Sequence, residues 1–158
     1  MQRFVESIRS SIQTKNWFAA IFMALAMPDI CGALENPDAK VGDRYRDWFT
    51  KYLAEKYKLR YVQFTAQDCY KFRCKCLHQG LAVRDNNERF ALTPPVPPHR
   101  FHLNSFNGVI QLQIDILCED ICLAVEQWSR DVENNNEVQN RILELINIHF
   151  PQGFIEFR

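Results

Sequence analysis

The sequence of residues 65 to 80 is typical of one complete helix, and this segment constrains the fold more than any other part of the chain. Thr65 is a favourable N-cap. Asp68, at the third helical position, can form the reciprocal hydrogen bond of a capping box and lies close to the positive end of the helix dipole. Gly80 is a typical helix stop, because glycine readily adopts the left-handed conformation found there. The sequence therefore predicts a helix with both ends marked.

One charged residue lies on the apolar face of this predicted helix. At about 100° per residue, the apolar side chains share one broad arc with Arg73 at its centre, whereas the lysines lie on the opposite side. A guanidinium stays charged, so its burial requires an anionic or hydrogen-bonding partner. Two interpretations stay open: an ion pair with an acidic residue such as Asp29, Glu35 or Glu119, or a phosphate site.

His78 favours the phosphate interpretation. It follows Arg73 by five residues and falls in the last turn of the predicted helix, where the helix dipole favours a cationic side chain. The two side chains point about 140° apart on an ideal helix. They can share one site only if that site wraps the helix end or if a second subunit completes it, and we therefore expect a cleft.

Arg73-x4-His78, at the end of a helix in a chain with mainly helical patterning, resembles the Arg-x4–6-His signature of the HEPN superfamily. HEPN stands for higher eukaryotes and prokaryotes nucleotide-binding domains. Residues 65 to 80, together with Trp17-Phe18 and residues 28 to 32, are similar to a plasmid- and defence-associated subfamily of uncharacterised HEPN proteins. The resemblance covers most of the chain, and residues 65 to 80 carry its sharpest signal.

This resemblance implies a metal-independent endoribonuclease, a toxin or defence effector, that works as a homodimer with its signature helices facing each other. Arg73 would contact the scissile phosphate, and His78 would transfer a proton to or from the ribose oxygens. RNA supplies its own nucleophile in the 2′-hydroxyl, so positioning, a proton carrier and an electrostatic clamp suffice. The implied partners are RNA or a nucleotide and an antitoxin or other defence protein, with no cofactor.

Four further residues are candidates for supporting the pair or for binding substrate. They are Cys74 and Gln79 within the motif and Asp29 and Glu35 upstream. We expect the two carboxylates to face Arg73. Many active HEPN nucleases carry Asn or Asp where this chain has Cys74, and some HEPN domains only bind nucleotides or act as scaffolds. A catalytically inactive binding module is therefore the alternative function, and an arginine that clamps a buried carboxylate at a subunit interface is the third interpretation.

Length and charge indicate one neutral domain, residues 1–158. The chain is large enough to bury a core, and 47% hydrophobic residues argue against disorder. Nineteen basic and nineteen acidic side chains cancel, so contact with RNA must be local. The densest basic cluster, residues 44–60, also contains acidic residues and is more typical of a solvated helix face than of a nucleic-acid groove.

The six cysteines are expected to be reduced and free of metal. Cys74, Cys76 and His78 point in different directions on an ideal helix and cannot converge on one ion. The N-terminal residues lack the pattern of a signal peptide, so we expect a cytoplasmic protein. The apolar run from 17 to 27 has eleven residues, well short of the ~20 that cross a bilayer, and predicts a core helix rather than a membrane span.

The apolar pattern predicts an all-α, HEPN-like bundle of about five to six helices, with a short irregular or two-stranded insertion near residues 84–105. Helices are predicted at residues 3–13, 16–27, 43–57, 65–80, 110–132 and 135–149. Pro28 marks a boundary or a kink, after which a new helical turn starts.

The predicted insertion contains two segments, 90–92 and 99–103, that alternate like short strands around a proline tract. His99, Arg100 and His102 are interpreted as exposed residues of the second strand rather than as RNA contacts. The aromatic tail, residues 150–158, is expected to dock on the body of the protein or on a partner subunit.

Overall fold

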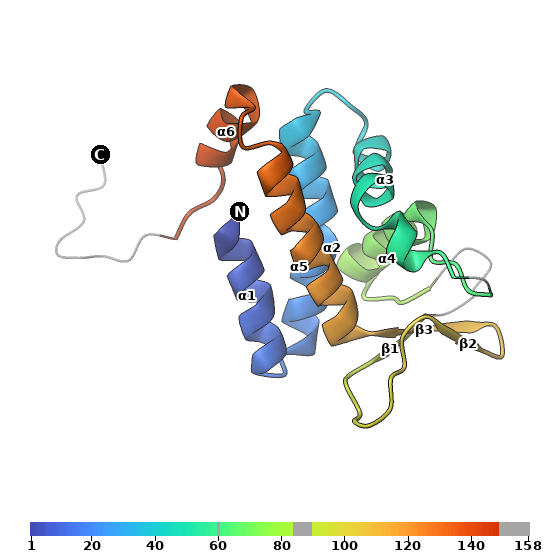
Figure 1. Ribbon diagram of the computed structural model, residues 1–158. Coiled ribbons are helices and arrows are strands. Elements are labelled where there is room, and N and C mark those ends of the chain that lie inside the picture. The colour runs from blue at the N-terminus through green and yellow to red at the C-terminus, as the bar shows by residue number, and fades with distance from the viewer. Residues whose placement is uncertain (60, 84–89, 149–158) are drawn as a thin grey trace.

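The computed structural model describes residues 1–59, 61–83 and 90–148. Within these ranges the chain forms six α-helices, one 3₁₀ helix and a small sheet (Figure 1). The elements are α1 (Gln2–Gln13), α2 (Trp17–Glu35), α3 (Val41–Tyr52), η1 (Ala54–Tyr57), α4 (Ala66–Gln79), β1 (Phe90–Thr93), β2 (Asn104–Phe106), β3 (Val109–Gln113), α5 (Ile114–Asp131) and α6 (Asn136–Leu143). The prediction of a mainly helical fold is confirmed, but the all-α class is too narrow because a three-stranded sheet is present.

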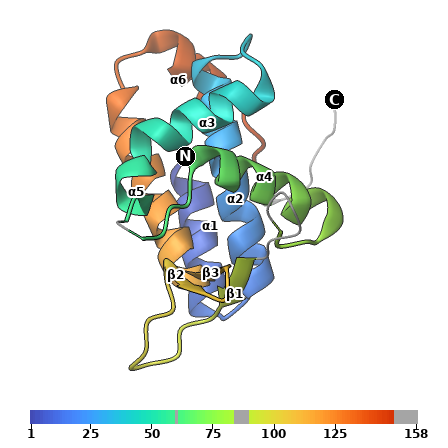
Figure 2. The same ribbon diagram turned by 90° about the vertical axis from the view of Figure 1, so that its right-hand side faces the viewer.

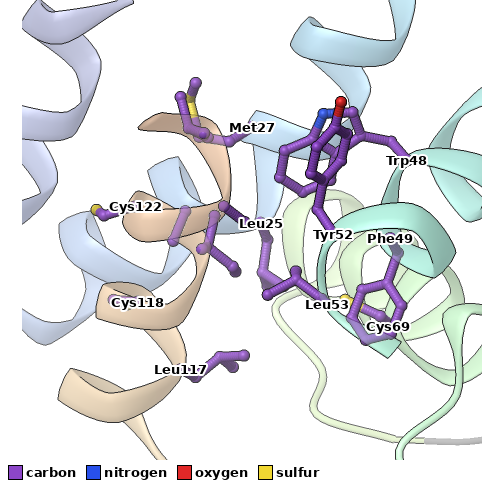
Figure 3. Close-up of a cluster of buried hydrophobic side chains, with 14 of the residues drawn as sticks. Leu25, Met27, Trp48, Phe49, Tyr52, Leu53, Cys69, Leu117, Cys118 and Cys122 are labelled. Atoms are coloured by element: carbon purple, nitrogen blue, oxygen red, sulfur yellow. The ribbon is translucent and has the colours of Figure 1, made fainter. Parts of the chain in front are cut away.

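Helix α2 lies at the centre of the fold. It packs against α1 and α5, which run beside it, and against α3 and α4, which lie together on another side (Figures 1 and 2). The buried apolar residues form one continuous cluster. Figure 3 shows part of it, where Leu25 of α2, Phe49 of α3 and Leu117 of α5 are among the labelled side chains. Every helix that positions a candidate site residue is therefore anchored on the same core.

Helix α2 continues through Pro28 to Glu35, so of the two predicted alternatives at Pro28, a boundary or a kink, the boundary is wrong. A proline inside a helix removes one hydrogen bond and costs about 3 kcal/mol or more. Met27, Cys31 and Leu34, on both sides of the proline, are buried, and a fully buried apolar side chain contributes about 1.5–3 kcal/mol. Packing thus outweighs the local preference of the proline.

Among the described residues, α2 is also the one helix long and apolar enough to cross a membrane by length and composition, with a mean hydropathy of 1.7. Half of that stretch is buried inside the fold, and α2 has neighbours on several sides. A core helix of a soluble protein meets the same criteria, and the packing of α2 is that of a core helix.

The sheet has the strand order β1-β3-β2, with β1 parallel and β2 antiparallel to β3. Of the two predicted strands, residues 90–92 are confirmed as part of β1. The strand predicted at residues 99–103 is wrong, because His99 forms only an isolated bridge to Val96. The sheet lies at one end of the helical bundle, and β3 leads directly into α5 (Figure 1).

The strands β2 and β3 form a hairpin that the sequence analysis does not predict. Asn107 and Gly108 connect them with positive φ angles of 50° and 77°, and Asn-Gly between strands is a strong hairpin signal. Ile110 and Leu112 alternate with glutamines, which is a strand pattern. Ile110 and Ile114 are also four residues apart, which is helical spacing, and for this reason a helix is predicted to start at residue 110. In the structure α5 begins at Ile114.

Two other predicted helices are shorter in the structure. The helix predicted at 43–57 ends at Tyr52 and is followed by the separate turn η1. The helix predicted at 135–149 ends at Leu143, and the apolar side chains of Leu143, Ile146 and Ile148 are exposed, so little burial supports further helical turns. The tail 150–158 and insertion residues 84–89 lie outside the described residues.

Gly32 sets the distance between α2 and α3. A Cβ atom at this position would lie 2.9 Å from the backbone carbonyl oxygen of Arg44 in α3, closer than real Cβ contacts allow. Because the obstacle is backbone, α3 would have to shift as a whole. The absence of a side chain at Gly32 therefore lets the two helices approach each other at Arg44.

We predict that Gly32→Ala lowers the free energy of unfolding. Overpacking costs about 1–3 kcal/mol, which exceeds the gain of about 1 kcal/mol from replacing a helical glycine by alanine. Chemical denaturation of the variant and the wild type measures the difference. Gly42→Ala is the matched control, because its Cβ atom would meet only the ends of the Arg46 and Tyr70 side chains, at 3.1 Å. A Gly32→Ala variant as stable as the wild type would contradict the close approach.

Candidate functional site

Helix α4 has the two ends that the sequence predicts. The Asp68 backbone N–H donates to Oγ1 of Thr65 at 3.1 Å, and the Thr65 N–H donates to the Asp68 carboxylate at 2.9 Å. Gly80 ends the helix in the left-handed conformation, with a φ of 68°. The capping box and the glycine stop are thus confirmed, and Arg73 and His78 lie on one well-defined helix.

Arg73 points into the protein and forms an ion pair with Asp29 of α2. Its Nη2 donates to Oδ2 of Asp29 at 2.5 Å, and the two side chains are only 15% and 17% exposed. This confirms that the arginine on the apolar face needs a carboxylate partner and that Asp29 faces it. The pairing was the first of the two open interpretations, but it uses only one of the five N–H donors of the guanidinium.

A second arginine shares the same carboxylate. Arg44 of α3 lies 3.4 Å from Oδ1 of Asp29 and is 17% exposed. We call Arg73, Asp29 and Arg44 the Arg73 cluster; it joins α4, α2 and α3. Two guanidinium groups and one carboxylate carry a net charge of one positive unit. The Nε atom of Arg73 is also buried without a hydrogen-bond partner. The Arg73 cluster is therefore half-buried, positively charged and incompletely satisfied.

Tyr45, next to Arg44 in the sequence, connects the same three helices. It is fully buried, and its hydroxyl donates to the Leu25 carbonyl of α2 at 3.2 Å and lies 3.3 Å from the Cys69 thiol of α4. Burial raises the pKa of Tyr45 well above its usual value and raises the pKa of Cys69 to about 12. Both groups stay neutral, so this contact positions the Arg73 cluster without adding charge to it.

His78 lies outside the Arg73 cluster. It is exposed in the last turn of α4, and no hydrogen bond or ion pair to it occurs within the described part of the chain. Five residues separate it from Arg73, which corresponds to about 140° around the helix. The two predicted catalytic side chains therefore point in different directions from α4, so a shared site must wrap the end of the helix or be completed by a second subunit.

The motif residues Cys74 and Gln79 have different surroundings. Cys74 is half-buried, and its Sγ accepts from Nη1 of Arg73 at 3.9 Å. It also interacts with Tyr70, and burial together with this contact raises the pKa of the tyrosine. Gln79 is exposed beside His78. Cys74 thus borders the Arg73 cluster, whereas Gln79 lies at the histidine end of α4.

The other predicted carboxylates do not face Arg73. Glu35 accepts from the indole Nε1 of Trp128 at 2.9 Å and from Lys51 at 3.4 Å. Glu119 pairs with Arg9. The expectation that Glu35 faces Arg73 is therefore wrong. Asp29 and Glu35 are six residues apart in one continuous helix and so project in different directions.

Arg44 is the residue of the Arg73 cluster that the sequence analysis misses. It belongs to the basic run 44–60, which the analysis interprets as a solvated helix face. A signal was present, because Arg44 precedes Trp48 by four residues and so shares the face on which that buried side chain lies. A second arginine on an apolar helical face is the same anomaly that identifies Arg73.

Most other cations of the 44–60 run are neutralised by nearby carboxylates. Arg46 pairs with Asp43, Lys51 with Glu35 and Lys56 with Asp120. These pairs favour the solvated, ion-paired interpretation over an open groove for nucleic acid. Arg60 lies outside the described residues.

The cysteines are free thiols, and five of the six are buried. Burial raises the pKa of Cys122 to about 12 and also raises the pKa of Cys118. These two residues of α5 are core side chains, as their spacing predicts. Within residues 1–59, 61–83 and 90–148, no group of three or more His, Cys, Asp or Glu side chains is placed to hold a metal ion.

Comparison with protein-family models, with curated proteins and with solved structures finds no match to this chain. A function must therefore be inferred from the residues themselves, above all from the Arg73 cluster and from His78 on the same helix.

We predict that Asp29→Ala destabilises the protein more than Arg73→Ala does. Without Asp29, two half-buried guanidinium groups lose their shared partner and repel each other, whereas Asp29 keeps Arg44 when Arg73 is removed. Breaking a buried pair so that a charge is left uncompensated costs about 3–5 kcal/mol, and we expect Asp29→Ala to approach the lower end of this range. Urea denaturation measures both variants. A larger loss in Arg73→Ala would show that the Arg44 contact contributes little.

Proposed function

We propose that this protein is a metal-independent endoribonuclease of HEPN type that acts as a homodimer, with Arg73 and His78 as its catalytic residues. The observation that carries the proposal is the net positive charge of the Arg73 cluster on the helix that also presents His78. A half-buried positive site with unused N–H donors favours an anion, and a phosphodiester is such an anion.

The Arg73 cluster supports a defined role for each of its members. Asp29 holds the Arg73 guanidinium in one orientation, and Arg44 offsets the charge of Asp29. Arg73 can then stabilise the additional negative charge that develops on the phosphate oxygens in the transition state. Electrostatic stabilisation of this kind is most effective where the donors are held in place before the reaction.

His78 is suited to proton transfer because it is exposed and carries no competing contact within the described residues. The 2′-hydroxyl loses a proton as its oxygen attacks phosphorus, and the O5′ leaving group gains a proton as the P–O5′ bond breaks. The products are a 2′,3′-cyclic phosphate and a 5′-hydroxyl. Imidazole side chains can take and give these protons, so no metal ion is needed for the step.

The direction of the two side chains supports the proposed homodimer. Because Arg73 and His78 point about 140° apart on α4, a cleft between two copies of α4 offers a way for both residue types to reach one phosphodiester. A two-fold axis would then supply each residue twice. We place the protein in the cytoplasm, as a toxin or defence effector that an antitoxin can restrain.

A catalytically inactive nucleotide-binding or scaffolding module is the second candidate. Cys74 is the observation that favours it, since this residue contacts Arg73 where many active HEPN nucleases carry Asn or Asp. A thiol is a weak hydrogen-bonding group, so the Arg73 cluster could retain phosphate affinity and lack the polar contact that catalysis needs.

We predict that the purified wild type cleaves RNA in the presence of EDTA and that Arg73→Ala and His78→Ala each lower the rate at least about 100-fold. Product analysis should show 2′,3′-cyclic phosphate ends. Arg130→Ala and His99→Ala are the matched controls, because both side chains are exposed and lie outside α4, and the substitutions remove the same kinds of charge and ring elsewhere. Both controls should cleave at the wild-type rate.

The assay separates the two candidate functions. If structured and unstructured RNAs both remain intact but RNA binding is lost in Arg73→Ala, the inactive binding module is supported. Cleavage that persists equally in folded Arg73→Ala and His78→Ala would rule out this pair as the catalytic residues. Sedimentation of the wild type tests the homodimer independently of activity.

A further inference from the structure

A polar cavity lies at the start of α5, on elements that the Arg73 cluster does not use. It has a volume of about 340 Å³ and is lined by Lys56, Leu59, Arg100, His102, Leu103 and Asp120. These residues come from η1 and the segment just after it, from the segment between β1 and β2, and from the first turns of α5. Figure 1 shows the start of α5, which β3 leads into directly. We call the cavity the His102 pocket.

His102 is buried in the wall of this pocket, with only 8% of its surface exposed. Its ring packs edge-to-face on Tyr57 at a centroid distance of 5.6 Å. Its Nδ1 accepts a hydrogen bond from the Gln113 backbone N–H at 3.3 Å. The interpretation of His102 as an exposed strand residue is therefore wrong, because β3 and η1 cover the ring.

The hydrogen bond from Gln113 determines which nitrogen of His102 carries the proton. Nδ1 is the acceptor, so the proton of the neutral ring lies on Nε2. Burial lowers the pKa of His102 below its usual value, and the nearby Arg100 lowers it further, although Asp120 and Asp115 act in the opposite direction. At neutral pH the residue is thus a neutral N–H donor, and no hydrogen bond from Nε2 occurs within the described residues.

The charged side chains that line the pocket, Lys56, Arg100 and Asp120, together carry a net charge of one positive unit. Both oxygens of Asp120 are occupied, Oδ1 by Lys56 at 2.9 Å and Oδ2 by the Tyr57 hydroxyl at 3.1 Å. The exposed guanidinium of Arg100 forms no hydrogen bond or ion pair within the described part of the chain. Lys56 has two further N–H donors beyond the one that Asp120 accepts.

We propose that the His102 pocket binds a phosphate group, with His102 as a neutral hydrogen-bond donor and with Arg100 and Lys56 as the cations. The three residues supply only donors, which suits an anion with several acceptor oxygens. Asp120, the carboxylate that would repel the anion, is already paired with Lys56 and accepts from the neutral Tyr57 hydroxyl, so Arg100 supplies the excess positive charge. A metal cation does not suit the pocket, because it would face two positive side chains and a ring nitrogen that bears a proton.

This binding site does not depend on the proposed nuclease activity. Neither Arg73 nor His78 lines the His102 pocket. The phosphate can belong to the end of an RNA or nucleotide or to an internal phosphodiester, since the chemistry of recognition is shared. Phosphate binding should therefore persist in Arg73→Ala, so that failure of one proposal is distinguishable from failure of the other.

The test is an NMR titration with inorganic phosphate at constant ionic strength, following the backbone amide of Gln113 that contacts His102. We expect saturable shifts in the wild type and in Arg73→Ala. Arg100→Gln should weaken binding at least about tenfold, the effect expected for one lost charged hydrogen bond. Arg130→Gln is the matched control, because Arg130 is an exposed cation in the last turn of α5, at the opposite end of the helix.

Two substitutions of His102 separate its donor role from its role in the fold. His102→Asn keeps an acceptor near the position of Nδ1 and removes the Nε2 donor, so it should remain folded and lose about tenfold in affinity. His102→Gln places an N–H group near the position of Nε2 and should retain more of the binding. Chemical denaturation and the dispersion of the amide spectrum show that each variant is folded.

Two RNA oligonucleotides, identical except for a 5′-phosphate, identify the source of the phosphate. Binding of only the phosphorylated RNA supports recognition of a terminal phosphate, and equal binding of both supports an internal phosphodiester. The proposal is overturned if neither inorganic phosphate nor either RNA shifts the Gln113 amide. It is also overturned if Arg100→Gln and folded His102→Asn bind as tightly as the wild type.

Discussion

The carboxylate of Asp29 is the interaction on which the arrangement of α2, α3 and α4 depends. It is the shared partner of Arg73 and Arg44, and all three side chains are largely buried. A guanidinium cannot lose its charge in the protein, so neither arginine could be buried there without a nearby anion. Gly32, one turn after Asp29, allows the close approach of α3 that this sharing requires. The fold thus concentrates two positive charges around one negative charge.

This local excess of charge is what connects the structure to a function. The chain as a whole is neutral, and several of its surface cations are paired with carboxylates. No long-range field draws in nucleic acid, so recognition must rely on sites where positive charge exceeds negative charge. The Arg73 cluster and the His102 pocket both have this property, and they lie on different elements. Under the two proposals, the protein would hold an RNA at more than one phosphate.

Particular residues show how far the candidate site and the fold were predictable. The ends of α4 follow from Thr65, Asp68 and Gly80, because capping depends on contacts within a few residues. The need of Arg73 for a partner follows from its place on the apolar arc. Arg44 and His102 were wrongly expected to be exposed. The local sequence does not show which other element of the fold will cover a charged or polar side chain. The Asn107-Gly108 turn could have been recognised from the local sequence. The helical spacing of Ile110 and Ile114 led instead to the prediction of a helix from residue 110.

The sequence by itself determined that the chain is mainly helical, where α4 begins and ends, and that Arg73 on this helix needs a partner for its charge. These properties depend on backbone preferences and on the periodicity of apolar residues, which act over a few positions. Only the tertiary structure decided that Asp29 rather than Glu35 satisfies Arg73, that Pro28 is accommodated inside α2, and that His102 is buried with Nδ1 on the Gln113 backbone. Each of these outcomes depends on residues far apart in the chain, whose approach is set by how whole helices pack rather than by local preference.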